Sequence, residues 1–322
     1  MKPNKNVEAF INDPDAIAAT VKKIESSREK NLNFELVSKL NTAFAADTQP
    51  QQAQLAAIVK AYSTQAIAEI MAETMQHQAN DDFYVYPLAG HTSTFAQRII
   101  LANTDHYDLS IDMIDAKQLN NYKAESKQNL AQRGIQFWGR ETMTYFIHTG
   151  GLKVSSWRHD VSTDNFVEQY CHHAGTRALD DGEVIFSRAN ETIMYESADE
   201  NVLAISLEFK ANKAPVTLMF SAADQQLKFQ NPSDELDSRI QLSMLLLKKL
   251  DYAKAIPTLK KYLTSSSHFI RWYAMQQILG IDALTVLDEL AQMAQEDDHH
   301  EVRLAAQQTL DIIRQKEFSH AC

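Results

Sequence analysis

Residues 107–113 read Tyr-Asp-Leu-Ser-Ile-Asp-Met, an unbroken alternation of apolar and polar side chains. Residues 203–209, Leu-Ala-Ile-Ser-Leu-Glu-Phe, follow the same two-residue period. Successive side chains of a strand point to opposite faces of a sheet, so this period is typical of a half-buried strand. The two stretches predict a β domain in the middle of the chain.

Shorter apolar segments surround these two stretches and are separated by turn signals such as Gly150-Gly151 and Asp180-Asp181-Gly182. The further predicted strands are residues 83–88, 95–102, 143–149, 152–157, 183–188, 192–197 and 215–220. One helix, from Asp115 to a C-terminal cap at Gly134, interrupts them. About nine short strands joined by tight turns indicate an antiparallel sandwich or barrel across residues 81–230.

Residues 1–80 contain no glycine and have apolar side chains at helical spacing. Asp13-Pro14 is a favourable helix start, because Asp can cap free N–H groups and Pro is tolerated in the first turn. A second helix is expected from Phe34 to Ala46, and a third from Pro50 through Met75. The sequence therefore predicts an N-terminal helical segment and an α+β fold.

Residues 231–322 return to helical periodicity and contain an internal repeat. Arg239, Arg271 and Arg303 are spaced 32 residues apart, and each begins an apolar helical segment. Partner helices are expected around residues 255–259 and 283–290. One helix pair cannot bury its apolar face alone, so neighbouring pairs should stack into a continuous core. The repeated arginines should tie successive turns together, through carboxylates such as Asp298 or through free carbonyl groups at a helix end.

The last repeat, residues 297–306, reads Asp-Asp-His-His-Glu-Val-Arg-Leu-Ala-Ala. An acidic or polar turn followed by Val-Arg and Ala-Ala resembles a HEAT repeat. The middle repeat resembles it less closely, and the first lacks the alanine. The resemblance implies a surface on which a protein partner docks.

The central domain resembles a cupin in its strand count, its size and its glycine turns. Residues 182–192 have the spacing of the later turn of such a domain, yet the place of its histidine is taken by Ile193 or Met194. Metal-binding cupins usually also carry a His-x-His pair, and none occurs in this chain. The resemblance thus implies a β vessel whose usual metal site is degenerate or is rebuilt from other residues.

Histidines are nevertheless dense in the central domain, and imidazole suits iron, zinc, copper or nickel. The candidate metal ligands are His91, His159, Asp160, His172 and His173. His172 and His173 cannot both line one pocket if they are extended, because neighbouring strand residues face opposite ways. Surface or hydrogen-bonded histidines are the alternative interpretation.

Trp157 and Arg158 are candidate ligand-binding residues beside His159. Arg158 could anchor an acidic substrate, because guanidinium groups pair well with carboxylates.

Several functional classes are disfavoured. The net charge of −11 repels phosphate backbones, and only short basic pairs such as Lys248-Lys249 occur, so no nucleic-acid partner is expected. No apolar run approaches the roughly 20 residues that span a bilayer, so no membrane partner is expected. With Cys171 and Cys322 as its two cysteines, the chain has no disulfide framework and fits a reducing cytoplasm.

No nucleotide-binding glycine motif, Gly-x-Ser-x-Gly, Cys-x-x-Cys or His-Glu-x-x-His motif occurs. Two functions remain open. The first is a cytoplasmic regulatory or scaffold protein that binds a small ligand in a cupin-like pocket and a protein on its helical repeats. The second is a cupin-type metalloenzyme, such as an oxygenase that uses Fe(II) or another divalent metal.

Overall fold

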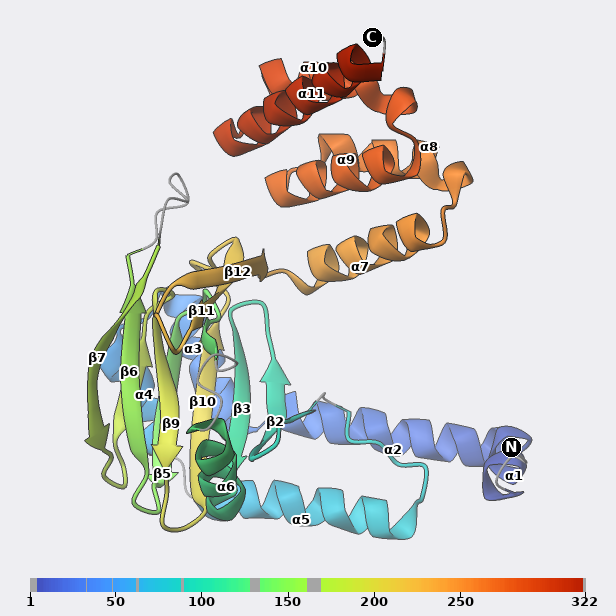
Figure 1. Cartoon of the computed structure of the whole chain (residues 1–322). Coiled ribbons are helices and arrows are strands. Elements are labelled where there is room, and N and C mark those ends of the chain that lie inside the picture. Colours follow the sequence, from blue (N-terminus) through green and yellow to red (C-terminus); the bar gives the residue numbers. More distant parts are fainter. Residues whose placement is uncertain are drawn as a thin grey trace. The chain divides into compact units, whose positions relative to one another are not determined.

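A computed structural model of the chain describes residues 5–32, 34–47, 49–61, 64–87, 90–127, 134–160 and 169–320 (Figure 1). The chain divides into two compact units. The first comprises Met1–His159, Cys171–Ala214 and Met219–Gln226, and the second comprises Asp160–Tyr170, Pro215–Leu218 and Leu227–Cys322. The first unit therefore holds both the N-terminal helices and most of the strands.

Five helices precede the first strand. They are α1 (Lys5–Ile11), α2 (Pro14–Leu32), α3 (Glu35–Ala46), α4 (Gln52–Lys60) and α5 (Thr64–Asn80). Asp13 caps α2 as expected, since its Oδ1 accepts the N–H groups of Asp15 and Ala16 at 3.1 and 3.0 Å. The single helix predicted from Pro50 is instead two helices. The first ends at Lys60 and the second begins at Thr64.

The largest sheet has six antiparallel strands in the order β1-β2-β3-β10-β5-β8. Its strands are β1 (Gly90–Thr92), β2 (Ala96–Asn103), β3 (Tyr107–Ile114), β10 (Val202–Phe209), β5 (Thr142–His148) and β8 (Val184–Ser187). The two alternating stretches that predict the fold, β3 and β10, are neighbours at its centre, with Ser110 opposite Ser206. Helix α6 (Ala116–Lys127) follows β3.

Two smaller sheets have the strand orders β7-β6-β9 and β12-β11-β4. Their strands are β6 (Lys153–His159), β7 (Cys171–Ala178), β9 (Glu191–Ser197), β4 (Gly134–Phe137), β11 (Val216–Ser221) and β12 (Leu227–Pro232). The described strands thus form three open sheets and close no barrel, which corrects the barrel alternative. Residues 83–87 are not a strand, and β1 lies a few residues later.

One face of the six-stranded sheet packs against the N-terminal helices. Tyr107, Leu109 and Ile111 of β3 are buried in one apolar cluster with Leu36 and Leu40 of α3. The hydroxyl of Tyr107 donates to the carbonyl of Val37 at 3.3 Å and pairs with the side chain of Asn41 at 2.9 Å. This outer face is therefore a conventional helix-on-sheet core.

The opposite, inner face of the six-stranded sheet meets the β7-β6-β9 sheet. At one end a second apolar cluster joins Phe146 and Ala204 of the large sheet to Val154 of β6. Further along the strands the inner face is polar but remains buried: Ser110, Asp112 and Ser206 are 3%, 6% and 2% exposed. Both faces of the central strands are thus covered, whereas their alternation alone predicts half-buried strands.

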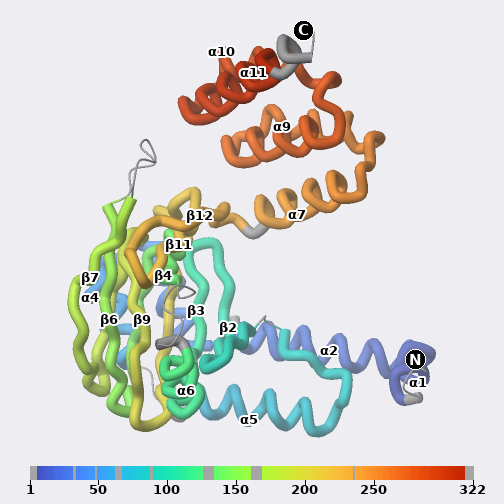
Figure 2. Tube along the Cα trace, in the orientation of Figure 1, coloured from blue at the N-terminus to red at the C-terminus, as the bar shows by residue number. Residues whose placement is uncertain are grey.

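From Glu235 onward the second unit is helical, as expected. It contains α7 (Glu235–Lys249), α8 (Ile256–Lys260), α9 (His268–Asp282), α10 (Leu287–Glu296) and α11 (His300–His320), with short 3-10 turns between them. Contacts join α7 to α9, α8 to α9 and α10 to α11, and Figure 2 shows α7, α9 and α11 following one another in a stack. Their buried side chains form a single cluster.

Two of the three repeated arginines, Arg271 and Arg303, make matching contacts. Arg271 Nη1 donates to the carbonyl of Ser265 at 2.9 Å, and Arg303 Nη1 donates to the carbonyl of Asp297. Each acceptor lies six residues before its arginine. Arg271 also pairs with the carboxylate of Asp297, one residue before the expected Asp298. The 32-residue spacing therefore corresponds to a recurring local geometry, while the HEAT-like character stays a prediction.

Candidate functional site

The polar part of the inner face brings together side chains from four elements. Arg98 of β2 lies opposite Asp112 of β3, and Ser206 and Glu208 of β10 lie opposite Thr144 and Thr142 of β5. Residues paired across strands, and residues two apart on one strand, share a face. The register therefore gathers charged and hydroxyl groups on the side of the sheet that faces β6 and β9.

Asp112 is the buried end of this network. Arg98 holds its carboxylate in a two-pronged pair, with Nε at 2.6 Å from Oδ1 and Nη2 at 3.0 Å from Oδ2. The Ser206 hydroxyl donates to Oδ2 at 2.5 Å, and Thr144 lies 3.3 Å from the Ser206 hydroxyl. The side chain of Asp112 is only 8% exposed, and these hydrogen bonds offset the cost of burying its negative charge.

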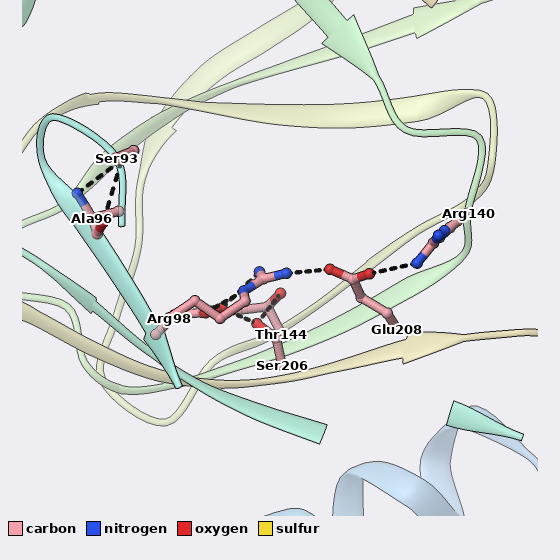
Figure 3. Close-up of polar contacts among 8 residues, drawn as sticks. Ser93, Ala96, Arg98, Arg140, Thr144, Ser206 and Glu208 are labelled. Carbon is pink, nitrogen blue, oxygen red and sulfur yellow. Dashed lines mark hydrogen bonds and ion pairs between the residues drawn. The ribbon is translucent and has the colours of Figure 1, made fainter. Parts of the chain in front are cut away.

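Glu208 is the open end of the same network (Figure 3). One of its carboxylate oxygens accepts from Nη1 of Arg98, and the other accepts from Nη1 of Arg140 at 3.2 Å. Arg140 lies in the turn between β4 and β5. The side chains of Glu208, Arg140 and Arg98 are 23%, 29% and 36% exposed, so this end of the network is accessible to water.

The electrostatics fix the charges of the network. Burial alone would lower the pKa of Arg98, but the carboxylates of Asp112 and Glu208 outweigh burial and raise it. Burial, together with the nearby Asp112, also raises the pKa of Tyr195 on β9, so its phenol stays neutral. Neither Arg98 nor Tyr195 exchanges a proton near neutral pH. These groups suit recognition of a charged ligand better than acid–base catalysis.

The sequence-predicted candidates on β6 and β7 are placed by the strand register. Trp157 lies opposite His173, with ring centroids 4.8 Å apart, and Arg158 lies opposite His172. His172 and His173 therefore face opposite ways, as expected for neighbours on a strand. His159 lies opposite Cys171 and packs its ring against Phe137 and Phe220 at 4.7 and 5.9 Å. Trp157 and Arg158 likewise point to opposite faces of β6.

His91 lies elsewhere, on the exposed edge strand β1, opposite Arg98 of the inner face. The turn that follows it is closed by Ser93, whose hydroxyl accepts the N–H of Ala96 at 3.0 Å (Figure 3). Asp160 follows β6 and is exposed. Within the described ranges, no three His, Cys, Asp or Glu side chains come together as they would around a metal ion.

Cys171 is fully buried at the start of β7, and burial raises the pKa of its thiol to about 11. A thiol in this state is a poor nucleophile.

Sequence reasoning missed the Arg98–Asp112–Glu208 network because the polar residues of alternating strands usually face solvent. A signal was nevertheless present. Asp112 and Glu208 lie on the two most regular strands of the chain, at polar positions of the same alternation. Only the second sheet, which covers this face, turns those positions into an interior site.

Comparisons with known proteins give no assignment. No protein-family model and no curated protein sequence matches the chain. Among solved structures, KdgF from Halomonas sp. is 13% identical over 38% of this chain and 86% of that chain, with a TM-score of 0.25. A cupin domain from Bordetella pertussis is 10% identical over 38% of this chain and 100% of that chain, with a TM-score of 0.23.

The DMSP lyase DddQ from Ruegeria pomeroyi is 10% identical over 49% of this chain and 73% of that chain, with a TM-score of 0.27. TM-scores of this size do not establish a common fold, and neither family nor activity follows from them. None of the helices in the part of the chain that the structure describes is both long and apolar enough to span a bilayer.

Proposed function

We propose that the chain is a ligand- and protein-binding protein with a regulatory or scaffolding role. In this proposal the polar inner face of the cupin-like β domain binds a small molecule, and the HEAT-like C-terminal helices dock a protein partner. The observation that carries the first half is the ion-pair network of the inner face, whose Glu208 end remains open to water.

The composition of this network favours binding over metal-dependent catalysis. A cupin-type metal centre would need imidazoles on the inner face, and this chain places Arg98, Asp112 and Glu208 there. Both carboxylates are engaged by arginines instead of being available to a cation. Fixed, mutually neutralised charges provide orientation and selectivity for a polar ligand.

Elemental analysis of the purified full-length protein tests this half of the proposal. We expect well under one equivalent of iron, zinc, copper, nickel or manganese per protein chain in every preparation. Preparations from cells grown with metal supplements should give the same result. One equivalent of a metal that survives gel filtration would overturn the proposal in favour of a metalloenzyme. Replacing His91, His159 and His172 with alanine would then show whether the sequence-predicted ligands hold the metal.

The second half of the proposal is supported by the stacked C-terminal helices and by the apolar side chains that they expose. Leu242 and Leu246 lie one helical turn apart on α7 and are 68% and 58% exposed. Exposed apolar residues that cluster on one face mark interaction surfaces.

Co-purification from the native host tests docking. A specific partner bound by the wild-type chain should be lost when Leu242 and Leu246 are both changed to Lys. Leu304→Lys on α11 is a matched control, because Leu304 is 51% exposed on another helix of the unit. Equal capture by all three proteins would contradict docking on α7.

A further inference from the structure

We infer that Arg98 and Arg140 form a clamp for the carboxylate of a small organic acid, and that Glu208 occupies the clamp when no ligand is bound. This inference rests on the proposed binding function and names the class of its ligand. Glu208 acts in it as an internal substitute for the ligand, tethered to β10.

The geometry of the clamp is the first support. Two guanidinium groups approach from separate elements, β2 and the β4–β5 turn, and meet on the two oxygens of a single carboxylate (Figure 3). Planar guanidinium forks recognise carboxylates with defined geometry. The side chain between them already shows which chemical group the space accepts.

The second support is how the two arginines are held. Arg98 commits Nε and Nη2 to Asp112, which orients Nη1 towards Glu208. Within the described part of the chain, the hydrogen bond of Arg140 runs from Nη1 to Glu208. Its other guanidinium nitrogens can therefore contact an incoming acid. One arginine is rigidly positioned and the other can adapt, an arrangement that lowers the ordering cost of binding.

Charge balance is the third support. Arg98, Arg140, Asp112 and Glu208 carry no net charge together, and the first three alone carry one positive charge. A single ligand carboxylate that displaces Glu208 restores neutrality, while Glu208, already 23% exposed, moves into water. The exchange replaces one guanidinium–carboxylate contact with another, so its electrostatic cost is small. The second carboxylate of a diacid such as succinate can remain in water, whereas a doubly charged phosphate would place both of its charges in the clamp and leave an excess negative charge there.

Isothermal titration calorimetry on the full-length protein tests the clamp, with acetate, succinate and inorganic phosphate as probes at constant ionic strength. Glu208→Gln removes the internal competitor's charge and should bind acetate and succinate about tenfold or more tightly than wild type. Adding Arg140→Met to Glu208→Gln should remove that gain. Circular dichroism and unfolding curves establish that each variant is folded.

Glu183→Gln is the matched control, since Glu183 pairs with a single arginine, Arg177, on the surface of the same unit. It should bind the probes as wild type does. Equal affinity of wild type and Glu208→Gln, or no binding by either, would overturn the clamp, and so would phosphate binding as tight as that of succinate.

If Glu208→Gln does not fold, Arg140→Met alone carries the test. Its affinity for succinate must fall about tenfold below wild type, and an unchanged affinity overturns the clamp. If the calorimetry contradicts the clamp and the protein contains no metal, the proposed binding function remains, with a ligand of another class. A stoichiometric metal would instead remove the proposed function itself.

Discussion

The chain contains two arginine–aspartate pairs of nearly the same geometry, one in each unit. Nε and Nη2 of Arg98 donate to the carboxylate oxygens of Asp112 at 2.6 and 3.0 Å. The same two nitrogens of Arg271 donate to the carboxylate oxygens of Asp297, both at 2.7 Å. The two aspartate side chains are 8% and 4% exposed. In isolation the two pairs would be indistinguishable.

They differ in where the remaining arginine nitrogen points. Nη1 of Arg271 donates to the backbone carbonyls of Ser265 and Ser266, so this cluster is closed and joins consecutive helices. Nη1 of Arg98 donates to Glu208, which is shared with Arg140 and open to water. The comparison teaches that the third contact, and not the ion pair, separates a structural tie from a binding site.

Breaking the closed cluster should give the largest effect. Arg271→Ala leaves Asp297 buried and unpaired, which should lower the free energy of unfolding of the helical unit by about 3–5 kcal/mol. Hydrogen exchange measured by mass spectrometry should show the loss within residues 268–320. Lys260→Ala, which breaks the more exposed pair with Glu289, should cost less than about 1 kcal/mol. Similar effects of the two variants would contradict the role given to Arg271.

The buried end of the inner-face network gives a smaller effect. Ser206→Ala removes a hydrogen bond to the ionised Asp112 while Arg98 remains, so the loss should be about 1.5–3 kcal/mol. Denaturant unfolding of the first unit (the β unit, which also holds the N-terminal helices), together with hydrogen exchange in β3 and β10, measures this loss. A loss below about 0.5 kcal/mol would mean that the Arg98 pair alone satisfies Asp112.

Acidification should affect the stability of the helical unit and of the β unit differently. His268 stacks on His299 at 3.7 Å beside Arg271, and burial, with His299 and Arg271, lowers its pKa from 6.5 to about 4. The unfolded chain takes up this proton below pH 6.5 and the folded chain resists it. The contribution of His268 is therefore complete above pH 6.5 and is lost as pH falls towards 4.

Unfolding curves across this window, with hydrogen exchange to locate the change, should show weakening in the helical unit. His268→Phe keeps an aromatic ring in the stack and should flatten the pH dependence there. In the β unit, His148 has a raised pKa from its contacts with Asp181 and Glu200, so its contribution stays present below pH 6.5. Equal pH slopes for wild type and His268→Phe would rule out His268 as the cause.

The smallest effect is expected at the surface of the β unit. Glu183→Gln breaks the pair with Arg177, whose side chain is 53% exposed, and should change the free energy of unfolding by less than about 1 kcal/mol. Chemical denaturation with hydrogen exchange measures it. A larger loss would show that exposure does not distinguish this pair from the buried ones.

Periodicity in the sequence was sufficient to predict the central strands and the helical C-terminal region. The alternation of residues 107–113 and 203–209 indicates β3 and β10, and the arginine spacing indicates equivalent turns around Arg271 and Arg303. The alternation depends on neighbours within a few residues, and the repeat depends on a fixed spacing, so both are visible in one sequence.

Features that depend on distant partners were missed. β7 begins at the buried Cys171 but is otherwise exposed on both faces, so it lacks the apolar alternation that marks a strand. The polar face around Asp112 is buried because residues some 40–80 positions later fold over it as β6 and β9. No pattern within β3 encodes that cover, so the sequence of β3 does not identify the network of Arg98, Asp112 and Glu208 as an interior site.

The burial of Cys171 provides a chemical probe of local opening in the β unit. Because its thiol is shielded from water and its pKa is about 11, alkylating reagents can modify it only after the end of β7 opens. In a Cys322→Ser chain, the rate of alkylation therefore measures how often this part of the molecule opens locally. Ligands that tighten the space between the sheets should slow that rate.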